Sequence, residues 1–144
     1  MNHNLKITNS LTRKKELFKP INPKQITMYA CGPTVYDNPH VGNARTLVVF
    51  DVLFRVLKLI YGNVNYVRNI TDIDDKIIEA SKKNKNPINE LTKDVSKVFH
   101  ENCKDLNCLD PTKEPKATEH IKEMIEMTKS LIKKKFAYES GEHV

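Results

Sequence analysis

The sequence predicts an α/β fold: the first half of a doubly wound parallel sheet, followed by a helical segment. Two short apolar runs, 26–31 and 64–70, have the length and flanking turn residues of buried strands. Between them, residues 42–60 are apolar around most of a helical surface, which is typical of a buried helix. Strand, helix and strand form a βαβ unit, so we expect parallel strands with a right-handed crossover.

The residues on either side of this unit have other patterns. Leu5–Phe18 has no clear period and predicts an extended arm, or a short strand and turn. Behind the unit we expect a helix over 74–83, a helix from Pro87 to about Asn102, a loop over 106–115, a helix capped by Thr118 with an apolar stripe from Ile121 to Ile132, and the start of a strand or hairpin over 136–144. A single βαβ unit is not a complete sheet, so we divide the chain into a sheet half, 1–80, and a helical part, 81–144, that looks interrupted.

Composition restricts the class of protein. Hydrophobic residues make up 39% and charged residues 29%, which suits a folded chain rather than a disordered one. The net charge of +6 fits a polyanionic partner, although a lysine-rich surface is more often simply solvated. No apolar run reaches the roughly 18 residues of a membrane helix, and Met1–Lys6 lacks the apolar core of a signal peptide. We therefore expect a cytoplasmic protein that does not contact membranes.

The three cysteines are an odd number, which favours thiols or metal ligands over a disulfide framework. Cys31 ends the first predicted strand, where a lone cysteine is usually a small buried hydrophobic residue. Cys103 and Cys108 lie in the helical part and its loop, and we interpret them as packing or loop residues rather than ligands.

The segment His40-Val41-Gly42-Asn43 joins the first strand to the buried helix. A helix start offers free backbone N–H groups and the positive end of a dipole, which together suit a phosphate. Gly42 permits close approach, while His40 and Asn43 are spaced so that both can face one anion. The alternative is a loop histidine beside an ordinary helix cap.

Three carboxylates follow the second strand, at Asp72, Asp74 and Asp75. They could bind a divalent cation. The favoured interpretation is helix capping, with Asp72 as the cap and the other two in the first turn.

Several motifs in order resemble a known family. His40–Asn43 resembles the His-Ile-Gly-His signature of class I aminoacyl-tRNA synthetases, with Asn43 replacing the second histidine. Met28–Asp37 and Tyr66–Ile78 closely resemble the cysteinyl-tRNA synthetases, as do Leu11–Lys15 and Glu114–Thr118, and the likeness extends from about Leu5 to Val144. The resemblance implies the N-terminal part of a Rossmann-like, HIGH-type nucleotidyltransferase catalytic domain at 1–80, with the family's connective insertion starting within 81–144.

The resemblance also implies an activity: ATP, accompanied by Mg²⁺, activates cysteine, which is then transferred to tRNA(Cys). His40 and Asn43 would be the catalytic residues, because they stabilise charge on the phosphates. With them, Gly42 and Thr34 would bind ATP.

The amino acid would occupy the strand ends. Gly32, Thr34 and Thr71 would bind cysteine, and Cys31 would be one ligand of a Zn²⁺ ion that selects the thiol. The family's other zinc ligands belong to a later segment.

The family's Lys-Met-Ser-Lys-Ser loop does not occur in the sequence. We therefore expect this chain alone to be inactive and to require the missing C-terminal half. Two alternatives stay open: an adenylating cysteine ligase of the mycothiol-pathway type, and a non-catalytic module that binds ATP or nucleic acid.

Overall fold

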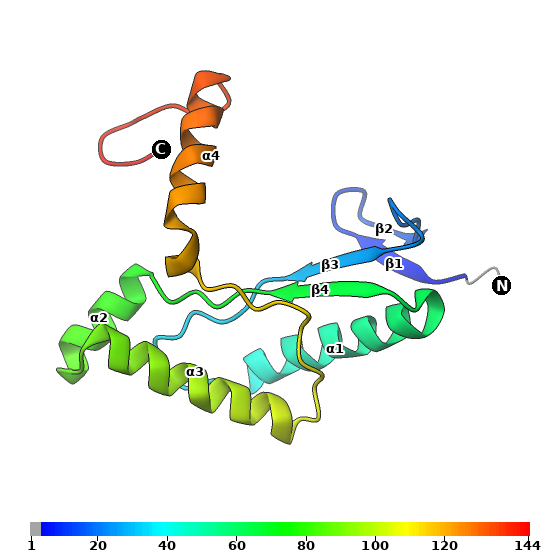
Figure 1. Cartoon of the computed structure of the whole chain (residues 1–144), viewed down its shortest axis with the longest axis horizontal. Coiled ribbons are helices and arrows are strands. Elements are labelled where there is room, and N and C mark those ends of the chain that lie inside the picture. Colours follow the sequence, from blue (N-terminus) through cyan, green and yellow to red (C-terminus); the bar gives the residue numbers. More distant parts are fainter. Residues whose placement is uncertain (1–3) are drawn as a thin grey trace.

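β3 (Ile26–Ala30) and β4 (Val64–Arg68) form a parallel pair, with Ile26 opposite Val64 and Ala30 opposite Arg68. α1 (Val41–Tyr61) connects them and runs along one face of the pair (Figure 1). The computed structural model describes residues 4–144, so the predicted segment Met1–Lys6 begins outside the described residues. The predicted parallel βαβ unit is confirmed, and its second strand ends at Arg68 rather than at residue 70.

The strand pair is apolar on the face that α1 covers. Side chains of β3 alternate, so that Ile26, Met28 and Ala30 are buried whereas Tyr29 is 65% exposed. The buried set forms one cluster with Tyr66 from β4 and with Phe54 and Leu57 from α1. The expectation of a buried strand is therefore met on one face only, because among the described residues only one face of β3 is covered.

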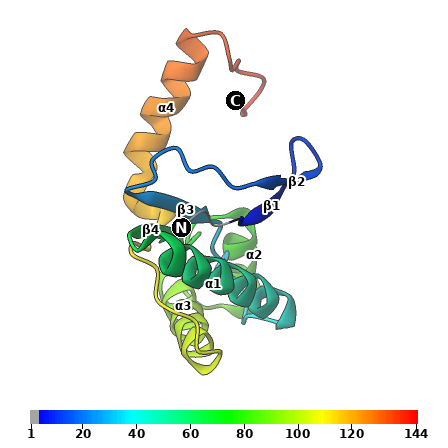
Figure 2. The same ribbon diagram turned by 90° about the vertical axis from the view of Figure 1, so that its right-hand side faces the viewer.

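α1 spans the predicted helix but is not buried all round. Leu47, Phe54 and Leu57 point into the protein, whereas Val49 is 56% and Leu59 87% exposed. In both views α1 and α3 lie on the same side of the strand pair (Figure 1, Figure 2), so only part of the α1 surface meets other residues. No described residue covers the outward face of α1, where Val49 and Leu59 lie.

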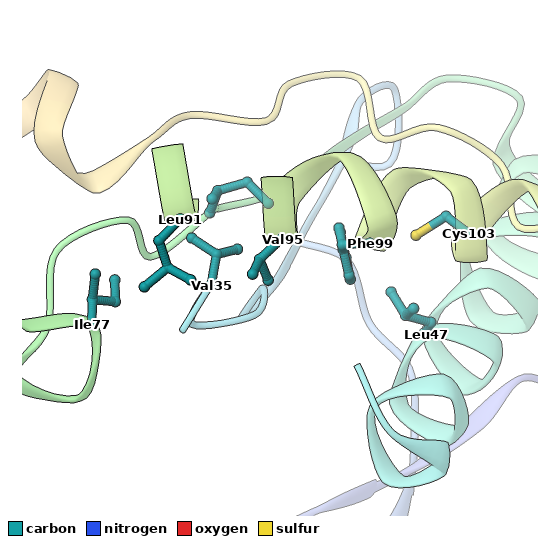
Figure 3. Close-up of a cluster of buried hydrophobic side chains, with 8 residues drawn as sticks. Val35, Leu47, Ile77, Leu91, Val95, Phe99 and Cys103 are labelled. Carbon is teal, nitrogen blue, oxygen red and sulfur yellow. The ribbon is translucent and has the colours of Figure 1, made fainter. Parts of the chain in front are cut away.

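α2 (Asp75–Asn84) and α3 (Ile88–Asp105) match the two predicted helices, and Pro87 is the N-cap of α3 rather than a residue of its first turn. Leu91, Val95 and Phe99 of α3 face inward as their helical spacing predicts. They form a second core cluster (Figure 3) with Val35, Leu47, Ile70, Ile77 and Cys103. This cluster supports the segments that follow β3 and β4.

The end of the predicted loop over 106–115 and the two residues after it, 112–117 together, pair with the sheet. The backbone N–H of Arg68 donates to Lys113 O at 3.1 Å, that of Ile70 donates to Pro115 O at 2.9 Å, and that of Ala117 donates back to Ile70 O at 3.0 Å. The segment therefore covers the edge of β4 opposite β3. A proline normally argues against a strand, because it has no backbone N–H to donate to a neighbouring strand. Pro115 pairs here only through its carbonyl oxygen, so the missing N–H does not prevent the pairing.

The C-terminal residues extend away from this body (Figure 1, Figure 2). A short helical turn, η1 (Ala117–His120), precedes α4 (Ile121–Lys133). Thr118 lies inside η1 and does not cap α4, so that prediction is wrong. The apolar stripe of α4 exists, but none of its described residues is buried. Residues 136–144 hold one antiparallel bridge, Ser140 to His143, in place of the expected strand.

At the other end, the segment Leu5–Phe18 forms a small antiparallel hairpin, β1 (Lys6–Asn9) with β2 (Lys14–Leu17), which confirms the strand-and-turn alternative. Phe18 ties it to the body, since its ring lies edge-on to Tyr61 with centroids 6.0 Å apart. Among the described residues, no helix has the length and apolar character needed to cross a membrane.

Candidate active site at the carboxyl ends of the parallel strands

The segments that follow β3 and β4 stay paired beyond the strand ends. Thr34 forms an isolated parallel bridge with Thr71. The Thr71 N–H donates to Pro33 O at 2.9 Å, and the Val35 N–H donates to Thr71 O at 3.1 Å. Ligands of open α/β sheets bind at the carboxyl ends of the strands. The structure therefore places Thr34 and Thr71, both predicted from the sequence, side by side at that edge.

Gly32 lies directly against the backbone of Asn69, in the segment that follows β4. A Cβ atom added to Gly32 would stand 1.5 Å from the backbone oxygen of Asn69, so no other residue fits this backbone path. The Gly32 N–H donates to the Asn69 side-chain oxygen at 3.0 Å. The backbone N–H of Gly32 is therefore already bonded within the protein. Gly32 leaves room for a ligand but does not offer it a free hydrogen-bond donor.

A cavity of about 220 Å³ opens between this edge and the start of α1. It brings together four of the predicted site residues, Gly32, Thr34, His40 and Asn43. Its remaining lining includes Tyr36 and Asp37 as well as the buried Val35, Val95 and Phe99 of the second cluster. Gly42, Cys31 and Thr71 lie in adjacent segments but outside this lining.

His40 and Asn43 form a reciprocal cap at the start of α1. His40 Nδ1 accepts from the Gly42 N–H at 3.0 Å, and Asn43 Oδ1 accepts from the His40 N–H at 2.9 Å. The Asn43 N–H donates to His40 O at 2.9 Å. The expectation of free backbone N–H groups at this helix start is thus largely wrong, because the cap uses them.

The cap fixes which atoms these two side chains offer to a ligand. Because Nδ1 of His40 accepts a hydrogen bond, the proton of a neutral ring lies on Nε2. Because Oδ1 of Asn43 accepts, its Nδ2 group faces away from the backbone. Each side chain therefore keeps an N–H donor, and no carboxylate lies in the first turn of α1 to oppose an anion.

Gly42 is required by the same cap. A Cβ atom at this position would lie 2.7 Å from Cε1 and 2.9 Å from Nδ1 of the His40 ring. The role of Gly42 here is therefore to make room for the histidine ring, which differs from the close approach of a ligand that the sequence suggests.

Cys31 follows β3 directly, and its thiol is exposed and free. The alternative interpretation of Cys31 as a small buried hydrophobic residue is therefore wrong. Within residues 4–144 no group of three or more His, Cys, Asp or Glu side chains is placed to hold a metal ion. Cys103 is buried in the second cluster and Cys108 packs against it, as expected of packing residues. Burial raises the pKa of both thiols above the ordinary value of 9.0, which opposes metal binding.

The three carboxylates after β4 have separate structural tasks. Asp74, not Asp72, caps α2: its Oδ1 accepts from the Lys76 N–H at 2.9 Å, and Asp75 lies in the first turn. Asp72 instead accepts from the N–H and the hydroxyl of Thr118, at 2.9 and 2.6 Å. The assignment of Asp72 as the cap is therefore wrong, because its carboxylate binds Thr118 of the returning chain instead.

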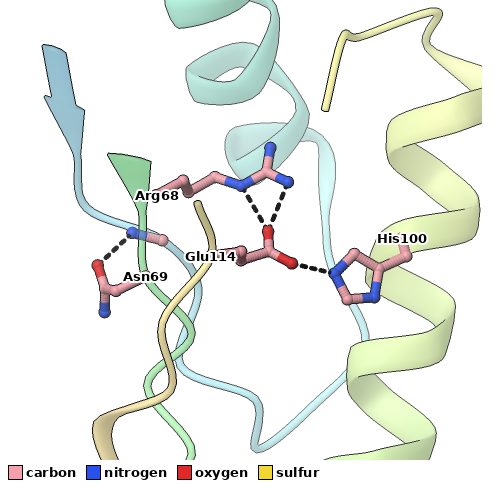
Figure 4. A network of polar contacts seen from close by, with 5 residues as sticks. Arg68, Asn69, His100 and Glu114 are labelled. Atoms are coloured by element: carbon pink, nitrogen blue, oxygen red, sulfur yellow. Dashed lines mark hydrogen bonds and ion pairs between the residues drawn. The ribbon is translucent and has the colours of Figure 1, made fainter. Parts of the chain in front are cut away.

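An ion network behind the strand ends was not predicted. Arg68, only 3% exposed, donates from Nε and Nη2 to Glu114 Oε1 at 3.0 and 2.7 Å, while Glu114 Oε2 pairs with His100 Nε2 at 2.5 Å (Figure 4). The guanidinium also lies over the Phe99 ring, 5.0 Å from its centre. The network joins β4, α3 and residues 112–117. Arg68 and Glu114 are 46 residues apart, and no motif in the sequence indicates that they pair.

Comparisons with known proteins identify the family that the sequence motifs resemble. The family model described as the class I (C) tRNA synthetase catalytic domain matches residues 17–144. A cysteine–tRNA ligase of Pelagibacter ubique is 56% identical over 146 residues, covering 100% of this chain and 32% of the relative. Cysteine–tRNA ligases of Wolbachia pipientis and Rickettsia prowazekii are 55% and 54% identical, and each covers 97% of this chain.

The chain spans about a third of the length of the curated relatives that it matches, 30 to 32% in these three. The matched region includes both parallel strands, the capped start of α1 and the cavity between them. The chain belongs to the class I tRNA synthetase family whose catalytic domain this model describes.

Proposed function

We propose that this chain forms the nucleotide- and amino-acid-binding part of a cysteine–tRNA ligase. The observation that carries the proposal is the cap of α1: His40 and Asn43 border one cavity, and each keeps an N–H donor. The triphosphate of ATP lies at this helix start, and cysteine lies by the strand ends.

The proposed reaction has two steps: transfer of the adenylyl group of ATP to cysteine, and then transfer of the cysteinyl group to tRNA(Cys). The carboxylate of cysteine attacks the α-phosphorus of ATP, and pyrophosphate leaves, which gives cysteinyl-adenylate. A hydroxyl of the terminal ribose of tRNA(Cys) then attacks the carbonyl carbon of this adenylate, and AMP leaves. Nε2–H of His40 and Nδ2–H of Asn43 donate to phosphate oxygens as their charge rises, which lowers the barrier. Gly42 and Thr34 shape the nucleotide site, and Mg²⁺ accompanies ATP. This reaction would take place in the cytoplasm.

Cys31 is the one candidate zinc ligand in the proposed site. Its exposed thiol stands at the carboxyl end of β3, beside Gly32. Zinc would hold the thiolate of cysteine and reject the hydroxyl of serine. One thiolate is far from the roughly four donors that zinc takes, and within residues 4–144 no group of three or more His, Cys, Asp or Glu side chains is placed to hold a metal ion.

The test joins this chain to the remaining two thirds of the Pelagibacter ubique ligase and measures cysteine-dependent exchange of pyrophosphate into ATP. We expect exchange, followed by charging of tRNA(Cys), whereas the 144-residue chain alone gives neither. Exchange with transfer to an amino sugar but not to tRNA would favour the mycothiol-type ligase. ATP or tRNA binding without exchange would leave only the binding module. Charging by the isolated chain would refute its dependence on the missing part.

A further inference from the structure

Asn69 connects the ends of the two parallel strands through its side chain. Its Oδ1 accepts from the Gly32 N–H at 3.0 Å and from the Tyr29 hydroxyl at 3.0 Å. Its Nδ2 donates to Thr71 Oγ1 at 3.0 Å. Figure 4 shows the amide directed at the backbone of the β3 extension, next to the Arg68 network. Both ends of the amide are therefore in use.

These partners allow only one orientation of the amide. A backbone N–H can donate but never accept, so the amide oxygen must face Gly32. The amide nitrogen then faces Thr71, whose oxygen must accept. The proton of the Thr71 hydroxyl is consequently directed away from Asn69, and no hydrogen bond donated by this hydroxyl is found within residues 4–144.

The position of Thr71 makes this free donor relevant to the site. Both of its backbone groups are bonded to the β3 extension, so the residue has little freedom to move. It is also the bridge partner of Thr34, which lines the cavity. A fixed hydroxyl that can only donate in the outward direction suits an anionic oxygen.

We propose that Asn69 is a positioning residue that sets the polarity of Thr71, so that the Thr71 hydroxyl donates to the carboxylate of the amino-acid substrate. The inference rests on the proposed function and assigns the carboxylate, rather than the phosphates, to this side of the site. Asn69 itself touches no reacting atom.

The test is a mutant cycle in the joined ligase, with exchange measured over ranges of cysteine and of ATP. Asn69→Asp keeps the size of the side chain and still accepts from Gly32, but its carboxylate draws the Thr71 proton inward. Thr71→Val removes the same donor directly. We expect each change to raise the KM for cysteine about tenfold and to leave the KM for ATP within about twofold.

The cycle separates polarity from mere packing. In the Asn69→Asp background, Thr71→Val should have almost no further effect, because the donor is already lost. Thr71→Ser should restore a KM near that of the unchanged enzyme. Tyr29→Phe, which removes only the exposed partner of Asn69, is the matched control and should stay within about twofold. A tenfold effect of Thr71→Val in both backgrounds, or an equal rise in the KM for ATP, would overturn the inference.

A second measurement on the 144-residue chain keeps the two proposals distinguishable. The carboxyl group introduced by Asn69→Asp should have a lower pKa, by NMR titration, than the same group in Asn69→Asp/Thr71→Val, because a donated hydroxyl stabilises the charged form. Equal pKa values would overturn the polarity argument whatever the joined ligase does. An inactive joined ligase with the expected pKa difference would instead count against the proposed function.

Discussion

The end of β4 is enclosed by neighbours, whereas none of the described residues of α4 is buried. Around residues 66–71 the extension of β3 lies on one edge, residues 112–117 lie on the other, and the core cluster that contains α3 supports them. Polar groups there have partners at fixed distances, while the apolar stripe of α4 faces solvent. The contrast shows that functional side chains need neighbours that hold them in place, and that an amphipathic helical pattern alone does not provide such neighbours.

The largest expected effect tests the close approach at the strand ends. Gly32→Ala should lower the free energy of unfolding by about 3 kcal/mol or more, because the added atom meets backbone that cannot move aside. Gly141→Asn is the matched control: Gly141 has a φ of 62° and nothing within 4 Å of an added Cβ, so the cost should be below about 1 kcal/mol. Urea unfolding of both variants checks this. Equal costs would mean that the strand ends are no more enclosed than the C-terminal turn.

The next effect tests the ion network. Glu114→Gln leaves the buried Arg68 without its counter-charge, which should cost about 3 kcal/mol of unfolding free energy. Glu101→Gln breaks the exposed pair with Lys97, 4.0 Å apart, and should cost less than about 0.5 kcal/mol. A cost below about 1 kcal/mol for Glu114→Gln would show that water reaches the network and that the frame is loose.

A smaller effect depends on pH. Burial raises the pKa of the Cys103 thiol above its ordinary value of 9.0, so in alkaline solution the unfolded chain loses this proton first. The unfolded state then binds fewer protons than the folded state, and stability falls as the pH rises above about 9. Cys103→Val should reduce the loss between pH 8 and pH 10 by about 1 kcal/mol or less, as measured by urea unfolding. An identical loss in the variant would mean that Tyr66, whose pKa burial also raises, or other groups account for it.

The smallest effect belongs to α4. Met127 is 65% exposed, so Met127→Lys should change the free energy of unfolding by less than about 0.5 kcal/mol. Val95→Lys, an equivalent change inside the second cluster, should prevent folding or cost about 3 kcal/mol or more. A large cost at Met127 in urea unfolding would show that α4 packs against the body in solution and would remove the contrast.

Local patterns located the βαβ unit and the helices that follow it, but not the surroundings of these elements. The apolar runs located β3, α1 and β4, and helical spacing located the inward residues of α3. Burial of α1 on all sides was wrong, because periodicity reports how apolar a surface is and not whether a partner covers it. The pairing of β4 with residues 112–117 was missed, because a proline such as Pro115 argues against a strand, although its carbonyl oxygen and the N–H groups of Lys113 and Ala117 pair with the backbone of residues 66–70.

The candidate site was predictable in part for the same reason. His40 and Asn43 stand out because their spacing suits one helix start, and the cavity brings them together with Gly32 and Thr34. Asn69 was passed over, since its importance lies in which of its atoms face Gly32 and Thr71. Such polarity depends on neighbours that are distant in sequence.

The most direct test of the central claim separates capping from phosphate binding at Asn43. Asn43→Asp retains an oxygen that accepts from the His40 N–H, but it replaces the outward donor with a negative charge. We predict an unchanged unfolding midpoint for the joined ligase and a loss of cysteine-dependent ATP–pyrophosphate exchange of about 100-fold or more. Exchange within about threefold of the unchanged enzyme would contradict the account, since Asn43 would then be a helix cap and nothing more.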